Sequence, residues 1–262
     1  MTSMPGVSEA ARPGLSAVII TLNEADRICD CLDSIAFCDE RIVVDAHSTD
    51  GTRELAAARG ARVIERDWPG YRSQKEFAVA AARYDWVLCI DADEQVSPQL
   101  RSEIESLRDR GFGGYAGASM RRRTWFFGAP LRFGTAAPDR LTRLFDRRRG
   151  GWRGRQVHEF AASAQPVARL RGRLHHYPYR SHRHHREKLE HYARLMAEEL
   201  RESGRRGSLA NLVVNPAWCF LRGYVLRLGF LDGWRGLLFA YREADYVRRK
   251  YLLLYRMARG LA

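Results

Sequence analysis

Several common signals are scarce in this sequence. Lysine is nearly absent, since only Lys75, Lys188 and Lys250 occur and 41 of the 44 basic residues are arginine. The five cysteines form no CxxC pair, which argues against a disulfide framework or a structural zinc site. No run of about 18 residues is free of charge, so no transmembrane helix is expected, and residues 1–14 lack the apolar stretch of a secretory signal. The sequence therefore predicts a cytoplasmic protein of a reducing compartment.

The composition is that of a globular protein with an uneven charge. Of the 262 residues, 45% are hydrophobic and 29% are charged, which is enough for one large domain or two small ones. Residues 1–110 hold 13 basic and 20 acidic side chains, a net charge of −7, whereas residues 111–262 hold 31 and 11, a net charge of +20. Unless the basic half is only a solvated face, it indicates a polyanionic partner such as nucleic acid, an anionic membrane or a phosphorylated substrate.

Strand-like and helix-like segments alternate in the first 110 residues. Short β-branched runs predict strands at residues 15–21, 41–45, 61–65 and 85–90. Helical spacing and capping residues predict helices at residues 24–37, 52–59, 73–83 and 99–110. Four such repeats predict an α/β fold with a Rossmann-like, mostly parallel sheet and flanking helices on both faces. Ligands of such folds bind at the edge where the carboxyl ends of the strands meet.

A different pattern follows residue 111. Strands are predicted at residues 115–124 and 141–145, a charged helix at 181–202, and further helices from residue 209 that mix apolar and aromatic residues with arginine. Apolar residues keep helical spacing over residues 212–228, and we expect Asn215-Pro216 to start or kink that helix.

This change of pattern divides the chain into three parts. We expect a flexible N-terminus at residues 1–14, an α/β domain at 15–180, and a helical, basic C-terminal extension at 181–262. The extension suits an anionic membrane interface, but it is equally typical of a helical cap packed on the α/β domain.

Polar residues follow three of the predicted strands. Asp91 and Asp93 come directly after the fourth strand, and residues i and i+2 of an extended segment point the same way. Such a carboxylate pair suits a Mg²⁺ or Mn²⁺ ion that carries a diphosphate, although an acidic turn before a helix looks the same. Asp45 ends the second strand, where a nucleoside hydroxyl or ring N–H would give its carboxylate a partner. Asp50, by contrast, suits a helix N-cap.

Glycine-rich phosphate loops are absent from these strand ends. The sequence contains neither GxGxxG nor GxxxxGK[ST], which argues against a dinucleotide fold and a P-loop NTPase. Thr21, Asn23 and Glu24 follow the first strand and could contact a nucleotide or cap the next helix. A nucleotide at this edge would therefore be held by side chains and a metal ion.

The motifs VIITLNE, IVVDAHSTDGT, the QK of YRSQKEFAVAAA, and WVLCIDADE occur in this order over residues 15–94. Together they resemble the family 2 glycosyltransferases, which have the GT-A fold and use nucleotide sugars. The later motifs PDRLTRLF, WRGRQVHE, HHYPYRS and LRLGFLDGWRGL resemble a narrower group, the bacterial glucosyltransferases of the lipopolysaccharide inner core. With these motifs the resemblance covers most of residues 15–251.

The resemblance implies roles for the matched positions. It implies a nucleoside pocket, a lysine near the nucleotide, and a carboxylate pair for the diphosphate and its metal. The corresponding residues are Thr21, Asn23, Glu24 and Asp45 for the pocket, Lys75 for the lysine, and Asp91 and Asp93 for the pair. Two positions depart from the pattern, because many members have Asp at the position of Ala46 and Asn at the position of Glu76.

Inverting transfer also needs a base for the acceptor hydroxyl. Between residues 111 and 168 the only acids are Asp139, Asp146 and Glu159. Glu159, in the motif VHE, lies where the family places its acceptor-side acid, so we predict that it is the base and that His158 orients it or contacts substrate. Asp139 is the second choice, and an ion pair of Glu159 with Arg153 or Arg155 is the structural alternative.

Two further groups of basic residues are candidates for contact with the acceptor. Arg140 and Arg143, in PDRLTRLF, are predicted to contact phosphates. Six of the eight histidines lie between His175 and His191, but their spacing is not a usual zinc pattern. One hypothesis is that His184, His185 and Arg186 face a phosphorylated acceptor.

The sequence thus predicts an inverting, metal-dependent glycosyltransferase. The narrower resemblance implies UDP-glucose as donor and a lipid-linked, phosphorylated acceptor such as the lipopolysaccharide inner core, with the protein peripheral on the inner face of the cytoplasmic membrane. A sugar-phosphate nucleotidyltransferase is an alternative, but its glycine-rich basic signature is missing. A nucleic-acid or polyanion binder is another, motivated by the basic half, but no recognised nucleic-acid-binding motif supports it, and no nucleic acid is expected as partner.

Overall fold

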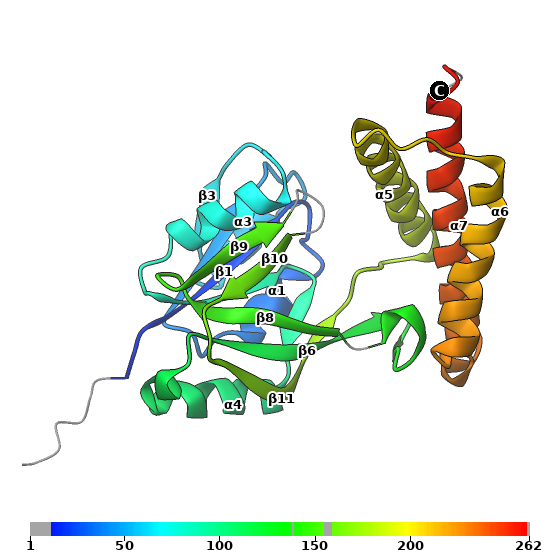
Figure 1. Cartoon of the computed structure of the whole chain (residues 1–262). Helices are drawn as coiled ribbons and strands as arrows, with labels where there is room; N and C mark the ends of the chain where they lie inside the picture. The colour runs from blue at the N-terminus through cyan, green and yellow to red at the C-terminus, as the bar shows by residue number, and fades with distance from the viewer. Residues whose placement is uncertain (1–11, 138, 155–158, 261–262) are drawn as a thin grey trace, which may run out of the picture. The chain divides into compact units, whose positions relative to one another are not determined.

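The computed structural model describes residues 12–137, 139–154 and 159–260. The chain forms two compact units (Figure 1). The first takes the residues up to Arg122 and Arg140–His175, and the second takes Arg123–Asp139 and the residues from His176 onward. Residues 123–139, which the sequence placed in the α/β domain, thus group with the C-terminal helices.

A parallel sheet forms the centre of the first unit. Its strands are β1 (Leu15–Thr21), β2 (Glu40–Asp45), β3 (Arg62–Glu65) and β4 (Trp86–Asp91), in the order β3-β2-β1-β4. All three of these pairings are parallel. The connecting helices are α1 (Ile28–Ser34), α2 (Thr52–Ala58), α3 (Tyr71–Ala80) and α4 (Pro98–Asp109). The predicted α/β class is confirmed, and α1 is shorter than the helix predicted at residues 24–37.

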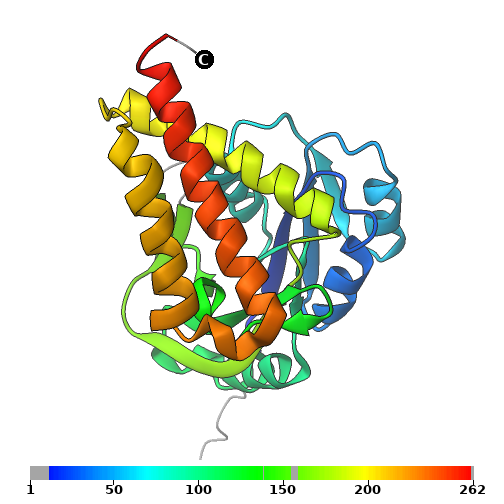
Figure 2. The ribbon, with the colours of Figure 1, turned by 90° about the vertical axis from the view of Figure 1, so that its right-hand side faces the viewer.

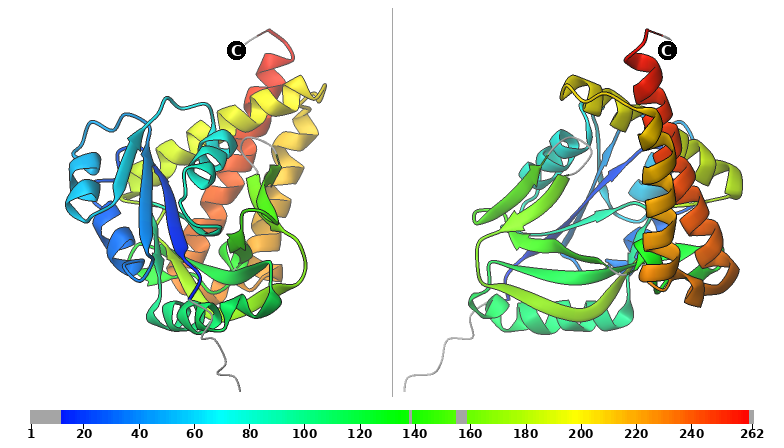
Figure 3. Two further views of the ribbon diagram at one scale, coloured as in Figure 1. Left: turned by 90° about the vertical axis from the view of Figure 1, so that its left-hand side faces the viewer. Right: turned by 45° about the vertical axis from the view of Figure 1, so that its right-hand side comes forward.

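Both faces of this sheet are covered, as the left view of Figure 3 shows. Successive side chains of a strand point to opposite faces, so Leu15, Ala17 and Ile19 of β1 pack in a cluster with α1 and α4. Val18 and Ile20 pack in a second cluster, with α3 and the hairpin of β9 (Gly150–Gly154) and β10 (Glu159–Ser163). Because all seven residues of β1 are buried, its apolar run does not alternate with polar residues.

The remaining strands extend this sheet. They are β5 (Glu94–Val96), β6 (Gly117–Phe126), β7 (Ala129–Pro130), β8 (Asp139–Asp146) and β11 (Val167–His176). Among the described residues the sheet has nine strands, in the order β3-β2-β1-β4-β8-β6-β11-β5 with β7 beside β6. β8 joins β4 in the antiparallel direction, with Trp86 opposite Asp146. The sequence did not predict β5, which is only three residues long. Two short 3₁₀ turns, η1 (Gly111–Gly114) and η2 (Gly134–Ala136), complete these connections.

The second unit is mostly helical. It contains α5 (His182–Glu202), α6 (Leu209–Phe220), α7 (Gly233–Met257) and the short turns η3 (Leu221–Leu226) and η4 (Gly229–Asp232). α7 packs against both α5 and α6 (Figure 2). Ser181 and Ser208 cap α5 and α6 with their side chains. Pro216 lies inside α6 rather than at its start, and after Phe220 the chain continues as the π-helical turn η3.

A small apolar core joins the parts of the second unit. Phe126 and Leu131 are buried against Phe239 of α7. Within the described residues, no helix combines the length and the apolar character that crossing a membrane requires.

Candidate functional site

Three candidate residues end neighbouring strands. The register of the sheet places Thr21 opposite Asp45 and places Asp91 opposite Ile20. Because adjacent strands lie about 4.8 Å apart, Asp45, Thr21 and Asp91 form a row at the carboxyl edge of the sheet. The Oγ1 atom of Thr21 is buried and has no hydrogen-bond partner among the described residues. The sequence prediction that these residues share one edge is confirmed.

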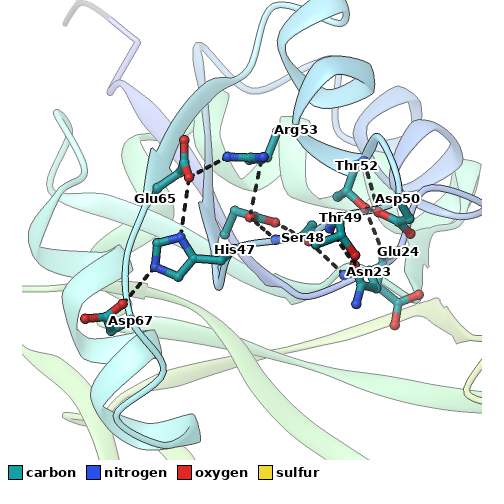
Figure 4. A network of polar contacts seen from close by, with 11 residues as sticks. Asn23, Glu24, His47, Ser48, Thr49, Asp50, Thr52, Arg53, Glu65 and Asp67 are labelled. Carbon is teal, nitrogen blue, oxygen red and sulfur yellow. Dashed lines mark hydrogen bonds and ion pairs between the residues drawn. The ribbon is translucent and has the colours of Figure 1, made fainter.

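The loop after β1 is bonded to the loop after β2 (Figure 4). The backbone N–H of Asn23 donates to Ser48 Oγ over 2.8 Å, and its Oδ1 accepts from the backbone N–H of Thr49 over 2.9 Å. The backbone N–H of Glu24 donates to Thr52 Oγ1 over 2.9 Å. Asn23 has a φ of 55°, a left-handed conformation that Asn tolerates better than most residues. The two loops are therefore fixed to each other before any ligand binds.

Asp45 holds this second loop from inside the protein. Its carboxylate is fully buried and accepts hydrogen bonds from the backbone N–H of Ser48 over 2.7 Å and from Ser48 Oγ over 2.5 Å. The guanidinium group of Arg53 lies 3.9 Å from Oδ1. A carboxylate at the end of a strand needs a polar partner, and in the structure Ser48 and Arg53 already provide it, whereas the sequence suggested a nucleoside. Contact of Asp45 with a nucleoside stays a prediction.

The N-cap of α2 is Gly51, so the N-cap prediction for Asp50 is wrong, although the role of this carboxylate is structural. Its Oδ1 accepts from the backbone N–H of Thr52 over 3.1 Å, at the start of α2, and its Oδ2 accepts from the backbone N–H of Ala25 over 3.1 Å. Burial alone would raise the pKa of Asp50, but the hydrogen bonds from Thr52 and Ala25 lower it.

His47 is an addition that the sequence argument missed. It has a φ of 63°, and its ring lies between Asp67, with Nε2 at 2.8 Å from Oδ1, and Glu65, with Nδ1 at 3.4 Å from Oε2 (Figure 4). The hydrogen bond with Asp67 raises the pKa of His47 above its usual value. A protonated ring would bring a positive charge to the outer end of β2.

A buried cluster of charges surrounds Asp91. Lys75 Nζ lies 3.0 Å from Asp91 Oδ1, and a guanidinium nitrogen of Arg143 lies 2.9 Å from Oδ2. The same nitrogen of Arg143 lies 3.1 Å from Oε1 of Glu94, whose Oε2 accepts from the backbone N–H of Asp91. Trp152 completes the cluster, because its ring lies under Lys75 and Arg143 at 4.6 Å and 5.6 Å. Both oxygens of Asp91 are thus engaged by cations.

Because this cluster is buried, the charge of each group depends strongly on the opposite charges beside it. Glu94 is fully buried and Arg143 is 5% exposed. Burial alone would lower the pKa of Arg143, but the carboxylates of Glu94 and Asp91 raise it far above its usual value. A cavity of about 10 Å³, lined by Lys75, Asp91, Arg143 and Trp152 among others, lies beside them and has room for about one water molecule. Arg143, which the sequence predicted as a phosphate contact, is here the partner of two carboxylates.

Asp93 lies just beyond this cluster. Ala92 and Asp93 form a turn between β4 and β5, so the extended geometry that we expected for Asp91 and Asp93 is wrong. No group of three His, Cys, Asp or Glu side chains in the part of the chain that the structure describes could hold a metal ion by itself. Mg²⁺ usually takes only one or two carboxylates from a protein and further oxygens from substrate phosphates and water. The hard carboxylate oxygens of Asp93, next to the edge of the sheet, fit that mode.

The remaining candidates lie in different places. One guanidinium nitrogen of Arg140 donates to the carbonyl oxygens of Ser119 and Leu170, over 2.9 Å and 3.1 Å. Glu159 begins β10, opposite Gly154, but its side chain lies outside the described part, as do His158 and Arg155.

The two other acids of this region differ. Asp146 is paired with Arg148, with a guanidinium nitrogen 2.7 Å from Oδ2, so its role is structural. Asp139 begins β8 and groups with the second unit.

The histidine-rich segment does not present His185 to a ligand. His185 is fully buried in the second unit, where it packs against Phe126 and Tyr179 and lies 2.8 Å, through Nδ1, from Arg242. Burial first, and then the charge of Arg242, lower the pKa of His185 to about 3. The hypothesis that His185 faces a phosphorylated acceptor is therefore wrong, and the residue belongs to the core.

Comparison with known proteins decides the class. The profile described as Glycosyl transferase family 2 matches residues 16–166. The chain belongs to this family. An uncharacterised glycosyltransferase of Rickettsia prowazekii is 31% identical over 86% of this chain and 80% of its own length. The lipopolysaccharide core biosynthesis glycosyltransferase LpsC of Rhizobium meliloti is 30% identical over 91% of this chain and 93% of its own length. The protein is therefore a glycosyltransferase, as the motifs indicated.

Among solved structures, a similar one is glucosyl-3-phosphoglycerate synthase from Mycobacterium tuberculosis in complex with Mn²⁺, UDP and glucosyl-3-phosphoglycerate. It is 28% identical and covers 48% of this chain and 51% of its own, with a TM-score of 0.36.

Besides His47, two residues of this glycosyltransferase's site were not predicted from the sequence. Glu94 follows the DAD motif, and its full burial depends on Arg143, which lies 49 residues later. Trp152 follows β8 and reaches the cluster only because β9 turns back toward α3. Glu94 could have been found as the third acid of the DADE motif, whereas nothing in the sequence around Trp152 indicates a role in the site.

Proposed function

We propose that this glycosyltransferase moves a sugar from a nucleotide sugar to a lipid-linked saccharide acceptor, with inversion at the anomeric carbon and with a divalent metal ion. The donor is UDP-glucose, and the acceptor is a phosphorylated lipopolysaccharide core. The likeness to LpsC, which extends over 91% of this chain and 93% of the relative, supports the acceptor class. The row of Asp45, Thr21 and Asp91 at the carboxyl edge of the sheet carries the proposal for the donor, because α/β folds bind nucleotides at this edge.

The nucleoside part of the donor would bind along this row. Thr21 offers a buried hydroxyl oxygen without a partner among the described residues, and burial of such a group is costly unless it forms a hydrogen bond. Asn23 and Glu24 lie in the loop that is already fixed to the loop after β2. A nucleoside would therefore meet a prearranged surface and would lose less entropy on binding than a flexible loop would require.

The diphosphate would bind beside Asp91. Lys75 and Arg143 each hold one oxygen of this carboxylate, so an approaching phosphate meets two cations as well as the negative charge. Asp93 would hold the Mg²⁺ or Mn²⁺ ion together with phosphate oxygens, and a bound metal ion stabilises the charge that develops on the leaving diphosphate. The fixed cations of the chain act on the same charge from inside the protein.

Glu159 remains our candidate for the base. A carboxylate that accepts the proton of the acceptor hydroxyl contributes about 10²–10⁴-fold to such a reaction. Glu159 begins β10, which pairs with β9, the strand whose Trp152 lies beside Lys75. We further propose His158 as a neighbour of the base or of the substrate.

The second unit supports a membrane-bound acceptor. Large apolar side chains on α6, η3, η4 and α7 are about half exposed, among them Trp218, Leu226, Leu231 and Trp234. Arg222, Arg227 and Arg235 are interspersed with them. Aromatic and aliphatic residues mixed with arginine suit the interface of an anionic membrane, and we propose that this unit holds the protein on the inner face of the cytoplasmic membrane.

Calorimetric titration tests the donor proposal. UDP, GDP and UDP-glucose are titrated into the protein with Mn²⁺ or with EDTA. We expect UDP and UDP-glucose to bind only with metal, and we expect Asp93→Ala to abolish this binding and the transfer activity without unfolding the protein. Asp33→Ala, which removes an exposed carboxylate from α1, is the matched control and should bind normally. Metal-independent activity of the wild type contradicts the metal assignment, and a folded protein that binds no nucleoside diphosphate contradicts the nucleotide-sugar assignment.

A further inference from the structure

An arginine-lined cavity lies on the first unit, apart from the carboxyl edge of the parallel strands. Its volume is about 380 Å³, which is within the range of sites for small ligands. The lining comes from the neighbouring strands β8, β6 and β11 and from the start of α4. The residues are Arg121, Arg140, Arg171, Arg173 and Gln99. We call this group the arginine cavity.

The arginine cavity faces away from the charge cluster around Asp91. Arg122, next to Arg121 in β6, reaches to within 3.7 Å of Glu94 in that cluster, and neighbouring residues of a strand point to opposite sides. In β11, Leu170 and Leu174 pack in the core, so the alternating Arg171 and Arg173 point to the other face. The cavity is therefore separate from the proposed donor site.

The guanidinium groups of this cavity have no acidic partner in the part of the chain that the structure describes. Among the described residues, no carboxylate lies within ion-pair distance of the four guanidinium groups. Glu103 is close in the fold, but its Oε2 accepts from the backbone N–H groups of Arg171 and Gly172, and its Oε1 accepts from the amide of Gln99. This carboxylate fixes the backbone at the rim of the cavity.

The cations of the cavity are crowded and partly desolvated. Burial first, and then the charges of Arg121 and Arg169, lower the pKa of Arg140. One guanidinium nitrogen of Arg173 is buried without a hydrogen-bond partner. Arg140 is held in place by the carbonyl oxygens of Ser119 and Leu170, so the crowding is not relieved by moving this side chain away. A bound anion would offset the repulsion among these cations.

We propose that the arginine cavity binds a phosphoryl group of the acceptor. This inference rests on the proposed function, in which the acceptor is phosphorylated and lipid-linked. The planar guanidinium group pairs with phosphate oxygens through two parallel hydrogen bonds, and four such groups around one cavity favour a ligand with more than one negative charge. Binding there would hold the acceptor at a second point, away from the atoms that react.

The test compares two double variants that remove the same charge. Arg121→Gln with Arg171→Gln changes two exposed side chains of the cavity that have no ion pair, so the fold should be retained. Arg83→Gln with Arg110→Gln changes two exposed arginines elsewhere on the first unit and is the control. Inorganic phosphate is titrated into each protein at constant ionic strength, and binding is followed by the rise of the unfolding midpoint. UDP binding with Mn²⁺ is measured in the same samples.

We expect the cavity variant to bind phosphate at least about tenfold more weakly than the wild type, while the control stays within about twofold. An equal loss in both variants, or no loss in either, overturns the proposal. UDP binding should be the same in all three proteins. A failure of UDP binding in the wild type would contradict the donor proposal alone, whereas the phosphate titration decides the cavity.

Vesicle binding distinguishes the two possible sources of the phosphoryl group, the saccharide and a lipid headgroup. Binding is measured to vesicles of phosphatidylcholine alone and of phosphatidylcholine mixed with phosphatidylglycerol. If only phosphate binding falls in the cavity variant, the cavity recognises a phosphate on the saccharide, as proposed. If binding to the mixed vesicles falls as well, by at least about tenfold and more than in the control, the site accepts lipid headgroups and the assignment to the acceptor saccharide is overturned.

Discussion

Replacing Arg143 by methionine should destabilise the protein strongly. Arg143 is 5% exposed, and its guanidinium group lies 2.9 Å from Asp91 and 3.1 Å from the fully buried Glu94. Removing one partner of a buried ion pair costs about 3–5 kcal/mol, because the remaining charge loses its closest compensation in a medium of low polarity. Among the described residues, Glu94 would keep only Arg122, at 3.7 Å, and Asp91 would keep Lys75, at 3.0 Å. Methionine fills most of the same volume, so little of the loss should come from a cavity. For a chain of this size the cost corresponds to a fall in Tm of about 6–20 °C.

A double-mutant cycle separates this electrostatic cost from lost packing. Glu94→Gln keeps an acceptor for the backbone N–H of Asp91 but removes the charge that Arg143 neutralises. The free energy of unfolding is measured by urea denaturation for the wild type, both single variants and the double variant. We expect the double variant to be about 2 kcal/mol more stable than the sum of the single losses allows. A loss below about 1 kcal/mol for Arg143→Met, or strictly additive losses, would refute the reasoning.

Three further changes test other parts of the molecule. Glu159→Gln should leave donor affinity unchanged and lower turnover by at least about 10²-fold; turnover within about tenfold of the wild type in an acceptor assay excludes Glu159 as the base. Burial raises the pKa of Glu243 from 4.5 to about 7, so the folded state holds this proton more tightly and loses stability as the pH rises from 4.5 to 7. Glu243→Gln should therefore stabilise the protein by on the order of 2 kcal/mol near pH 8 and by much less near pH 5. Equal gains at both pH values in urea denaturation would contradict this. A Cβ atom on Gly172 would lie 2.4 Å from the backbone of α4, whereas one on Gly151 would meet nothing within 4 Å; thermal unfolding should therefore show a loss of more than about 2 kcal/mol for Gly172→Ala and little change for Gly151→Ala, and similar losses for the two would argue against the close approach.

The sequence was sufficient for the parallel half of the fold because local signals and tertiary structure agree there. β1 is a continuous apolar run that a parallel sheet buries on both faces. Ser97 caps the predicted helix α4 and Pro98 begins it, and Gly60, with a φ of 73°, follows the end of α2. The row of Thr21, Asp45 and Asp91 follows from the parallel connection alone, since that connection brings the carboxyl ends of the strands together.

The partners within the site could not be predicted in the same way. Arg140 and Arg143 are three residues apart in one motif, yet Arg140 is bonded to backbone carbonyls and Arg143 to two carboxylates. The difference arises because β8 inserts beside β4 in the antiparallel direction, a pairing that local spacing does not encode. The sequence likewise suggested a nucleoside as the partner of Asp45. It did not show that the loop bends so that Ser48 bonds to this carboxylate.

Because the two units alternate along the chain, the protein cannot be divided into them by a single cut. The chain passes from one unit to the other at residues 122–123, 139–140 and 175–176. Phe126 and Leu131, which precede the second of these points, are buried by Phe239, more than a hundred residues later. Truncation after residue 175 would therefore leave the hairpin of β6 and β7 with its aromatic face exposed to water. Such a fragment should aggregate. Exchange of the C-terminal region between relatives should therefore succeed only if residues 123–139 are transferred with it.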